Sequence, residues 1–276
     1  MSYKTIIVHM DAGKRRRQRL DLAFTLAEKY DAHLIGLFGV EPLQVPAAPE
    51  AAPMLIEHME KLRRQASEAA AQEFRDKMRK EQYSGKSEWR ATLSDGLAAL
   101  QFHAKYADLV VAGQPDPDGD GVPGWFAHEL VMSIGRPVLY VPFAGRFDDC
   151  GKRVLIPWNA SREAARAVKD GVPFLQKAAA AEVVTFDPEK VFHDDAALPD
   201  PDIGAYLARH DAKVTVTAQP TAGIDVGSAI LSRAADNEAD LIVMGAYSHS
   251  RIRELVLGGA TRALFKSMTV PTLMSH

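Results

Sequence analysis

The sequence predicts an α/β protein made of two similar halves, each an open, mostly parallel five-stranded sheet with helices on both faces. Short apolar segments alternate with amphipathic helical segments, which is typical of parallel sheets linked by crossover helices. The order of segments begins again at residue 153. One segment also recurs almost letter for letter, as ADLVVAG at residues 107–113 and ADLIVMG at residues 239–245.

The first half contains five short apolar runs, each bounded by turn residues, which indicate buried strands. Helical periodicity between these runs predicts crossover helices. The predicted strands are residues 4–10, 34–38, 89–93, 109–112 and 138–141, and the predicted helices are residues 19–30, 54–80, 96–106 and 125–134. Segments rich in Pro, Ala, Asp or Gly, at residues 41–53 and 114–124, are predicted loops.

The second half repeats this order, with Ser161 as the predicted N-cap of its first helix. A polar stretch with two glycines, residues 143–152, is the predicted linker. We therefore expect one domain at residues 1–144 and another at residues 151–276. The predicted strands of the second half are residues 153–157, 182–186, 213–217, 241–244 and 270–274.

Composition excludes several protein classes. A net charge of -3 over 276 residues argues against a nucleic-acid partner, which a strong basic excess would favour. The single cysteine, Cys150, excludes an internal disulfide framework and suits a reducing compartment. No apolar run approaches the roughly 18 residues that a membrane helix needs. We therefore expect a cytoplasmic protein that does not act at a membrane, and no metal-ligand spacing is visible.

The stretch after residue 239 has the pattern of a phosphate site. The apolar run ends at Gly245, a polar loop with Ser248, His249 and Arg251 follows, and Gly258-Gly259 opens a helix. Backbone N–H groups at a helix N-terminus favour an anion. Arg251, Arg253 and Arg262 pair with phosphate or are simply solvated, and the sequence leaves both interpretations open.

The spacing of this stretch resembles the nucleotide-binding segment of the universal stress protein family, G-x2-G-x9-G followed by Ser or Thr. Gly245 and Gly258 keep that spacing, Ser248 stands at the second glycine, and Gly259 stands at the first hydroxyl position. Thr261 offers a hydroxyl two residues later. The resemblance covers both halves and implies a tandem member with a Rossmann-like, adenine nucleotide alpha hydrolase-like fold. It also implies a pseudo-dimer of the halves within one chain, while a further homodimer stays open.

The two halves differ at the positions that this family uses. Asp11 follows the first strand of the first half, whereas Asn159 stands there in the second. The loop between Gly113 and Gly124 is shorter by two residues and contains prolines and acids, so we expect a degenerate first site. The predicted nucleotide site comprises Pro157, Trp158, Asn159, Met244, Gly245, Ser248, His249, Arg251, Gly258, Gly259, Ala260 and Thr261.

The resemblance implies binding of ATP or AMP, with or without Mg²⁺, and a sensing or regulatory role in stress response. The adenosine is expected near Asn159 and Met244. No catalytic residue is assigned, because no convincing general base or metal-ligand set is visible, so we expect at most slow ATP hydrolysis. One alternative is a nucleotide-free interaction or small-ligand module. Another is an enzyme of the same architecture, such as a nucleotidyl transferase.

Overall fold

A computed structural model describes residues 2–40, 52–93, 95–116, 122–191, 202–247 and 259–276. Its internal contacts divide the chain into two compact units. One is Tyr3–Arg136, and the other is Pro137–His276 together with the first residues of the chain. Each unit is an open, mostly parallel α/β sheet, so the predicted fold class is confirmed.

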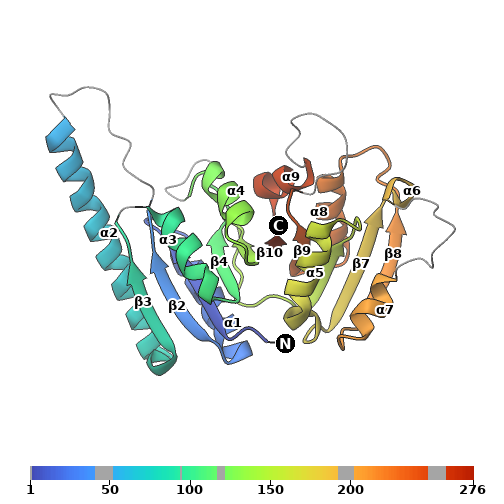
Figure 1. Ribbon diagram of the computed structural model, residues 1–276, viewed down its shortest axis with the longest axis horizontal. Coiled ribbons are helices and arrows are strands. Elements are labelled where there is room, and N and C mark those ends of the chain that lie inside the picture. Colours follow the sequence, from blue (N-terminus) through green and yellow to red (C-terminus); the bar gives the residue numbers. More distant parts are fainter. Residues whose placement is uncertain (1, 41–51, 94, 117–121, 192–201, 248–258) are drawn as a thin grey trace. The chain divides into compact units, whose positions relative to one another are not determined.

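The unit Tyr3–Arg136 contains four parallel strands in the order β3-β2-β1-β4. Figure 1 shows these strands side by side, with the long helix α2 beside β2 and β3. The strands are β1 (Thr5–Met10), β2 (His33–Phe38), β3 (Ser87–Ala91) and β4 (Leu109–Gly113). The α-helices are α1 (Arg16–Tyr30), α2 (Ala52–Lys80), α3 (Gly96–His103) and α4 (Gly124–Ser133), with short 3₁₀ turns at Ser84–Lys86 and Ala104–Tyr106.

The second unit contains six strands in the order β5-β10-β9-β6-β7-β8. Among the described strands of this unit, β5 pairs antiparallel with β10, and the pairs β10–β9, β9–β6, β6–β7 and β7–β8 are parallel. The strands are β5 (Val138–Val141), β6 (Arg153–Pro157), β7 (Ala180–Phe186), β8 (Thr215–Gln219), β9 (Leu241–Gly245) and β10 (Thr272–Ser275). The helices are α5 (Arg162–Leu175), α6 (Pro188–Val191), α7 (Ile203–Ala208), α8 (Val226–Asp236) and α9 (Gly259–Ser267).

The antiparallel pair joins the last strand of each sequence repeat. Leu139 pairs with Leu273, and each leucine lies two residues after a proline, Pro137 or Pro271. Because equivalent residues face each other, the pairing of β5 with β10 is symmetric. Contacts therefore place β5 with Pro137–His276. The domain boundary at residues 144–151 remains a prediction drawn from the repeat.

The recurring ADL motif has one structural role in both units. Asp108 accepts hydrogen bonds from the backbone N–H groups of Lys4 (2.7 Å) and Thr5 (3.0 Å). Asp240 accepts them from residues 151–153, at 2.9 to 3.1 Å. In each unit this aspartate holds the chain that enters the central strand, β1 or β6. The repeated carboxylate is therefore explained by strand alignment.

Several predicted elements differ from the structure by a few residues at their ends, and β3, for example, occupies Ser87–Ala91 rather than residues 89–93. Strand β8 occupies Thr215–Gln219, two residues beyond the predicted start at residue 213, because its pairing register with β7 begins at Glu182 and Thr215. Helix α1 begins at Arg16 rather than residue 19. No helix among the described residues is both long and apolar enough to cross a membrane.

Candidate functional site

The carboxyl ends of neighbouring parallel strands meet at one edge of the second unit. Strand β6 ends at Pro157 and its neighbour β9 ends at Gly245. Helix α5 begins just after β6, and helix α9 is the next described element after β9. Ligands of open α/β sheets bind outside the carboxyl ends of strands, so this edge is the candidate site.

Asn159 organises the turn between β6 and α5. Its side-chain oxygen Oδ1 accepts hydrogen bonds from the backbone N–H of Ser161 (3.2 Å) and from the Ser161 hydroxyl (2.8 Å). The Ser161 hydroxyl oxygen in turn accepts the N–H of Ala164, at 3.2 Å. The predicted N-cap is confirmed. The side-chain oxygen of Asn159 thus stabilises the turn between β6 and α5.

Gly245, at the end of β9, packs against the first turn of α5. A Cβ atom added there would lie 2.5 Å from both the backbone N of Ala164 and the backbone carbon of Glu163. The missing side chain therefore makes room for the first turn of α5 on the end of β9. The absence of a side chain at Gly245 is therefore explained by packing against α5, and its place in the nucleotide site stays a prediction.

Thr261 ties the end of β9 to the first turn of α9. Its hydroxyl oxygen accepts the backbone N–H of Tyr247 at 3.1 Å, and its side chain is buried. Gly259, two residues earlier, is exposed, and no heavy atom of the described residues lies within 4 Å of a Cβ added there. In the part of the chain that the structure describes, the start of α9 is therefore anchored through Thr261 and exposed at Gly259.

The remaining predicted residues fall into three groups. Met244 is buried at the end of β9. Pro157, Trp158 and Ala260 are partly exposed. The predicted loop residues Ser248, His249, Arg251 and Gly258 lie outside the described residues.

Sequence reasoning missed a buried carboxylate at this edge. Glu163, in the first turn of α5, is 2% exposed and pairs with the exposed Arg162. Burial tends to raise the pKa of Glu163, but the hydrogen bond and charge of Arg162, with His276, hold that pKa below its usual range. An acidic residue in the first turn after a predicted N-cap was the available signal, since the helix dipole favours it there.

The equivalent edge of the first unit is closed by Arg19. The Nη2 atom of Arg19 lies 2.7 Å from Oδ2 of Asp11, and both side chains are buried. The Arg19 Nε donates to the carbonyl oxygen of His9 at 3.0 Å. A Cβ atom on Gly113 would lie 2.3 Å from Nη1 of Arg19. The guanidinium thus fills the space between the ends of β1 and β4, while Gly124 at the start of α4 is exposed, with no described residue near its Cβ position.

The position of Arg19 along its helix is a sequence signal for this closure. Arg19 shares a helical face with Ala23 and Leu26, at spacings of four and seven residues, and both are buried. A cation on an apolar face one turn into a helix requires a buried partner. Asp11 is that partner.

His9 completes the closed edge of the first unit. It is fully buried, its ring stacks on Phe126 at a centroid distance of 5.1 Å, and its Nε2 lies 3.1 Å from the carbonyl oxygen of Gly39. Burial lowers the pKa of His9 to about 4, with Arg19 lowering it and Asp11 raising it. The ring is therefore neutral at physiological pH, with Nε2 as the donor.

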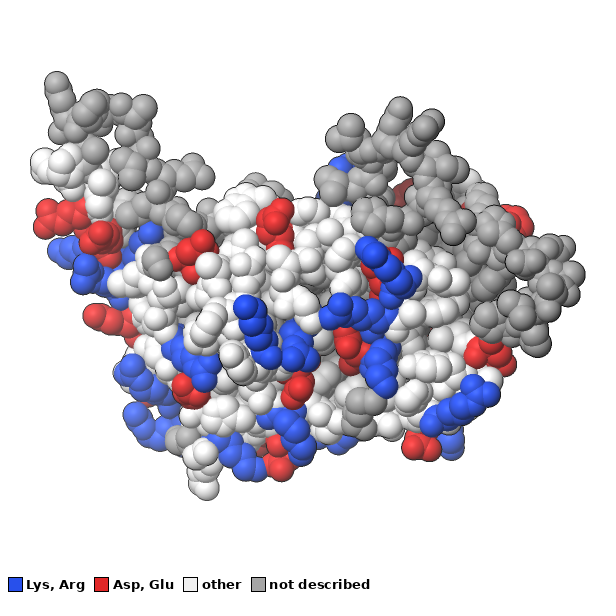
Figure 2. Space-filling view, in the orientation of Figure 1, with Lys and Arg blue, Asp and Glu red and all other residues white. Residues whose placement is uncertain are grey.

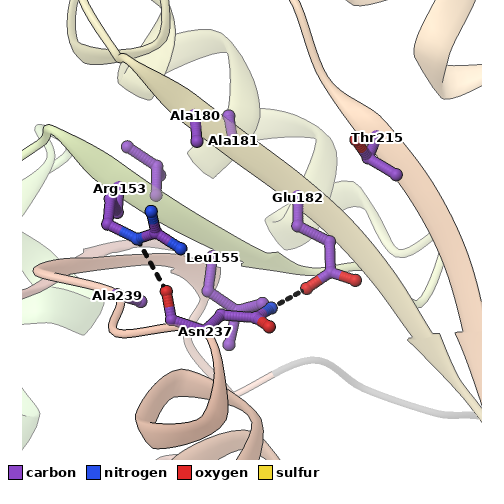
Figure 3. A pocket seen from close by; sticks show the side chains of 9 residues that line it. Arg153, Leu155, Ala180, Ala181, Glu182, Thr215, Asn237 and Ala239 are labelled. Atoms are coloured by element: carbon purple, nitrogen blue, oxygen red, sulfur yellow. Dashed lines mark hydrogen bonds between the residues drawn. The ribbon is translucent and has the colours of Figure 1, made fainter.

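A separate pocket lies at the opposite, amino ends of β6, β7 and β8 (Figure 3). Glu182 forms one wall, and its carboxylate accepts hydrogen bonds from Arg233 (3.1 Å from Nε), from the Thr217 hydroxyl (2.7 Å) and from Asn237. Burial opposes ionisation of Glu182, but these donors together hold its pKa below the usual range. The carboxylate is ionised and fully engaged.

The charged side chains on the described surface are mixed in sign. Lys and Arg side chains alternate with Asp and Glu over the described surface drawn in Figure 2. Among the described residues, no group of three or more His, Cys, Asp or Glu side chains is arranged to hold a metal ion.

Comparison with known proteins gives the family of the second half. Residues 151–276 match the model of the universal stress protein family. The chain is 44% identical over 45 residues to universal stress protein Slr1230 of Synechocystis sp. (strain ATCC 27184 / PCC 6803 / Kazusa), a match that spans only 16% of this chain and 16% of that relative.

Two solved structures share the fold over nearly the whole chain. One is a universal stress protein from Archaeoglobus fulgidus DSM 4304, with 15% identity and a TM-score of 0.67, covering 98% of this chain and 97% of that chain. The other is a putative universal stress protein from Pseudomonas aeruginosa UCBPP-PA14, with 14% identity and a TM-score of 0.52, covering 99% and 93%. At these identities the likeness shows the fold alone.

Proposed function

We propose that residues 151–276, which match the universal stress protein family, bind an adenine nucleotide, ATP or AMP. The phosphates lie over the start of α9, with or without Mg²⁺. The adenosine lies between Asn159 and the end of β9. The protein acts as a sensor or regulator in stress response in the cytoplasm, and any ATP hydrolysis is slow.

One observation carries the proposal: the first turn of α9 presents an open N-terminus at the carboxyl edge of the sheet. Gly259 is exposed with no described residue near its Cβ position, and Thr261 anchors the turn through the Tyr247 N–H. The first N–H groups of a helix have no partner within the helix, and the helix dipole places partial positive charge there. This geometry suits a phosphate group.

The carboxyl edge of the first unit differs from that of the second, which supports a nucleotide site in the second unit. Its carboxyl edge is filled by Arg19, which is ion-paired with Asp11 and packed over Gly113. Among the described residues, the neighbours of a Cβ atom added at Gly245 are atoms of α5 rather than an arginine side chain. We therefore expect one nucleotide per chain.

The test is calorimetric titration with ATP and with AMP of the full chain and two matched variants. Gly259→Asp adds a negative charge at an open position, and Gly259→Asn adds nearly the same shape without charge. The carboxylate in Gly259→Asp repels the phosphates and competes with them for the helix N-terminus. This variant should therefore bind ATP about tenfold more weakly or worse. Gly259→Asn should stay close to the original chain.

Equal ATP affinity in both variants would place the phosphates elsewhere. Absence of ATP and AMP binding by the unmodified chain would favour the alternative, a nucleotide-free interaction or small-ligand module. Binding of two nucleotides per chain would contradict the closure of the first unit by Arg19.

A further inference from the structure

The pocket at the amino ends of β6, β7 and β8 has an apolar floor and a volume of about 230 Å³. It lies within the unit Pro137–His276, at the edge of the sheet opposite to the proposed nucleotide site. Small side chains leave the hollow open, because Ala180, Ala181 and Ala239 line it where larger residues would fill it. Leu155 and Val154 complete the apolar surface.

Two guanidinium groups stand at this end of the unit, and only one has a carboxylate partner. Arg233 pairs with Glu182 through both Nε and Nη2. Arg153 donates from Nε to the carbonyl oxygen of Asn237 at 2.8 Å, which fixes its orientation. Among the described residues, no carboxylate lies within ion-pair distance of the Arg153 guanidinium. Its terminal amino groups point into the space between β6 and Glu182 (Figure 3).

The nearby carboxylates, Asp240 and Glu182, are engaged with groups other than the Arg153 guanidinium. Asp240 directs its carboxylate to the backbone N–H groups of residues 151–153. Glu182 accepts from Arg233, Thr217 and Asn237, so its four lone-pair positions are occupied. The pocket therefore combines an oriented, uncompensated pair of N–H donors with an apolar floor.

The matching edge of the first unit lacks this chemistry. In the register of β6 and β7, Arg153 pairs with Ala180. In the register of β1 and β2, the first pair is Thr5 with His33. The first unit thus has a hydroxyl in place of the guanidinium and an imidazole in place of the small side chain. The chemistry of the pocket therefore comes from the particular residues of the second unit and is not a general feature of the fold.

We propose that this pocket binds a small carboxylate-bearing molecule with a short apolar body. The carboxylate accepts two parallel N–H bonds from the terminal amino groups of Arg153, a geometry that guanidinium and carboxylate share. The apolar body covers Leu155 and the alanine floor. This second ligand is independent of the nucleotide, because the two sites lie at opposite ends of the strands.

The test uses hexanoate as the probe and neutral hexanamide as its matched control, followed by NMR of the full, isotope-labelled chain. For a ligand of this size we expect saturable hexanoate binding with a Kd of about 1 mM, with shifts in the Arg153 Nε–H and the Ala181 amide. Hexanamide should bind about tenfold more weakly or worse, because it lacks the charge.

Two variants separate charge from shape. Arg153→Gln removes the guanidinium and should weaken hexanoate binding about tenfold. Ala180→Leu keeps Arg153 but fills an exposed part of the floor, and it should abolish hexanoate binding. Lys152→Gln removes a neighbouring exposed charge and should leave hexanoate binding unchanged. Thermal unfolding of each variant checks that the fold is kept.

Absence of saturable hexanoate binding by the unmodified chain overturns the proposal. So does unchanged affinity in Arg153→Gln, or shifts confined to the carboxyl edge near Asn159. Retained hexanoate binding in a chain saturated with ATP supports two separate sites, whereas displacement of hexanoate by ATP contradicts them. The outcome does not depend on whether ATP binds at all, because the hexanoate titration stands alone.

Discussion

The guanidinium of Arg19 and the carboxylate of Asp11 form a buried ion pair, 2.7 Å apart, at the carboxyl edge of the first unit. Asp11 also accepts the backbone N–H of Gly13 at 2.8 Å, so the turn after β1 and the start of α1 depend on one carboxylate. A buried charge without its partner is costly. The pair therefore fixes this turn and also excludes a ligand from it.

Replacing Arg19 by Met should strongly destabilise the unit Tyr3–Arg136. The variant leaves the Asp11 carboxylate buried without a countercharge, at a cost of about 3–5 kcal/mol in the free energy of unfolding. Urea unfolding followed by hydrogen exchange in β1 and β4 measures the loss. Arg17→Met, at an exposed position of the same helix, is the matched control and should lose little.

The double variant Arg19→Met with Asp11→Asn sharpens this experiment. Removing both charges should recover part of the stability, because no isolated buried charge remains. Equal stability of Arg19→Met and Arg17→Met would show that the ion pair contributes nothing to this unit.

Stability should fall between about pH 6.5 and pH 4 because of His9. The folded-state pKa of about 4 lies below the ordinary value of 6.5, since burial disfavours the charged ring. The unfolded chain then binds a proton in this range that the folded chain does not bind. The stabilisation is fully present above pH 6.5 and is lost as the pH falls towards 4, by about 3 kcal/mol in all.

The free energy of unfolding measured at pH 7, 6 and 5 tests this linkage. Carboxylates also contribute to acid sensitivity, so the informative quantity is the difference between the original chain and His9→Gln. The variant keeps a donor for the Gly39 carbonyl oxygen and removes the titrating ring. If both proteins lose the same stability between pH 7 and 5, the folded pKa of His9 is not depressed.

Asp108 and Asp240 should each stabilise the entry to one central strand. Asp240→Ala removes the acceptor of three backbone N–H groups and should cost about 2 kcal/mol, while Asp108→Ala removes the acceptor of two and should cost less. Hydrogen exchange locates the effect: faster exchange is expected in β6 for the first variant and in β1 for the second. Asp236→Ala, at an exposed position, serves as the control.

Local features of the fold could be predicted from the sequence, whereas tertiary contacts could not. The strand–helix order, the repeat of the ADL motif and the Ser161 cap follow from local pattern and were predicted. The burial of Arg19 was not, because propensity and periodicity along one helix do not show which side chain another strand end will meet. The pocket beside Arg153 was also not predicted, because its lining residues come from three strands and a turn that are far apart in the sequence.

The glycines of the candidate site illustrate the same limit. Gly245 and Gly259 were both predicted to belong to the nucleotide site. Their surroundings differ: Gly245 is in contact with the backbone of α5, whereas Gly259 is exposed and has no described residue near its Cβ position. Only packing distinguishes a glycine that a neighbouring helix requires from one that is exposed.

This difference predicts opposite results for two identical substitutions. Gly245→Ala places a Cβ 2.5 Å from the backbone of Ala164 and Glu163, so α5 must shift, at a cost of about 1–3 kcal/mol. Gly259→Ala meets no neighbour and replaces glycine by a better helix former, so it should be neutral or gain up to about 1 kcal/mol. Thermal unfolding of both variants, with hydrogen exchange in α5 and α9, measures the two effects. A loss of stability in Gly259→Ala that matches that in Gly245→Ala would mean that the start of α9 is not open.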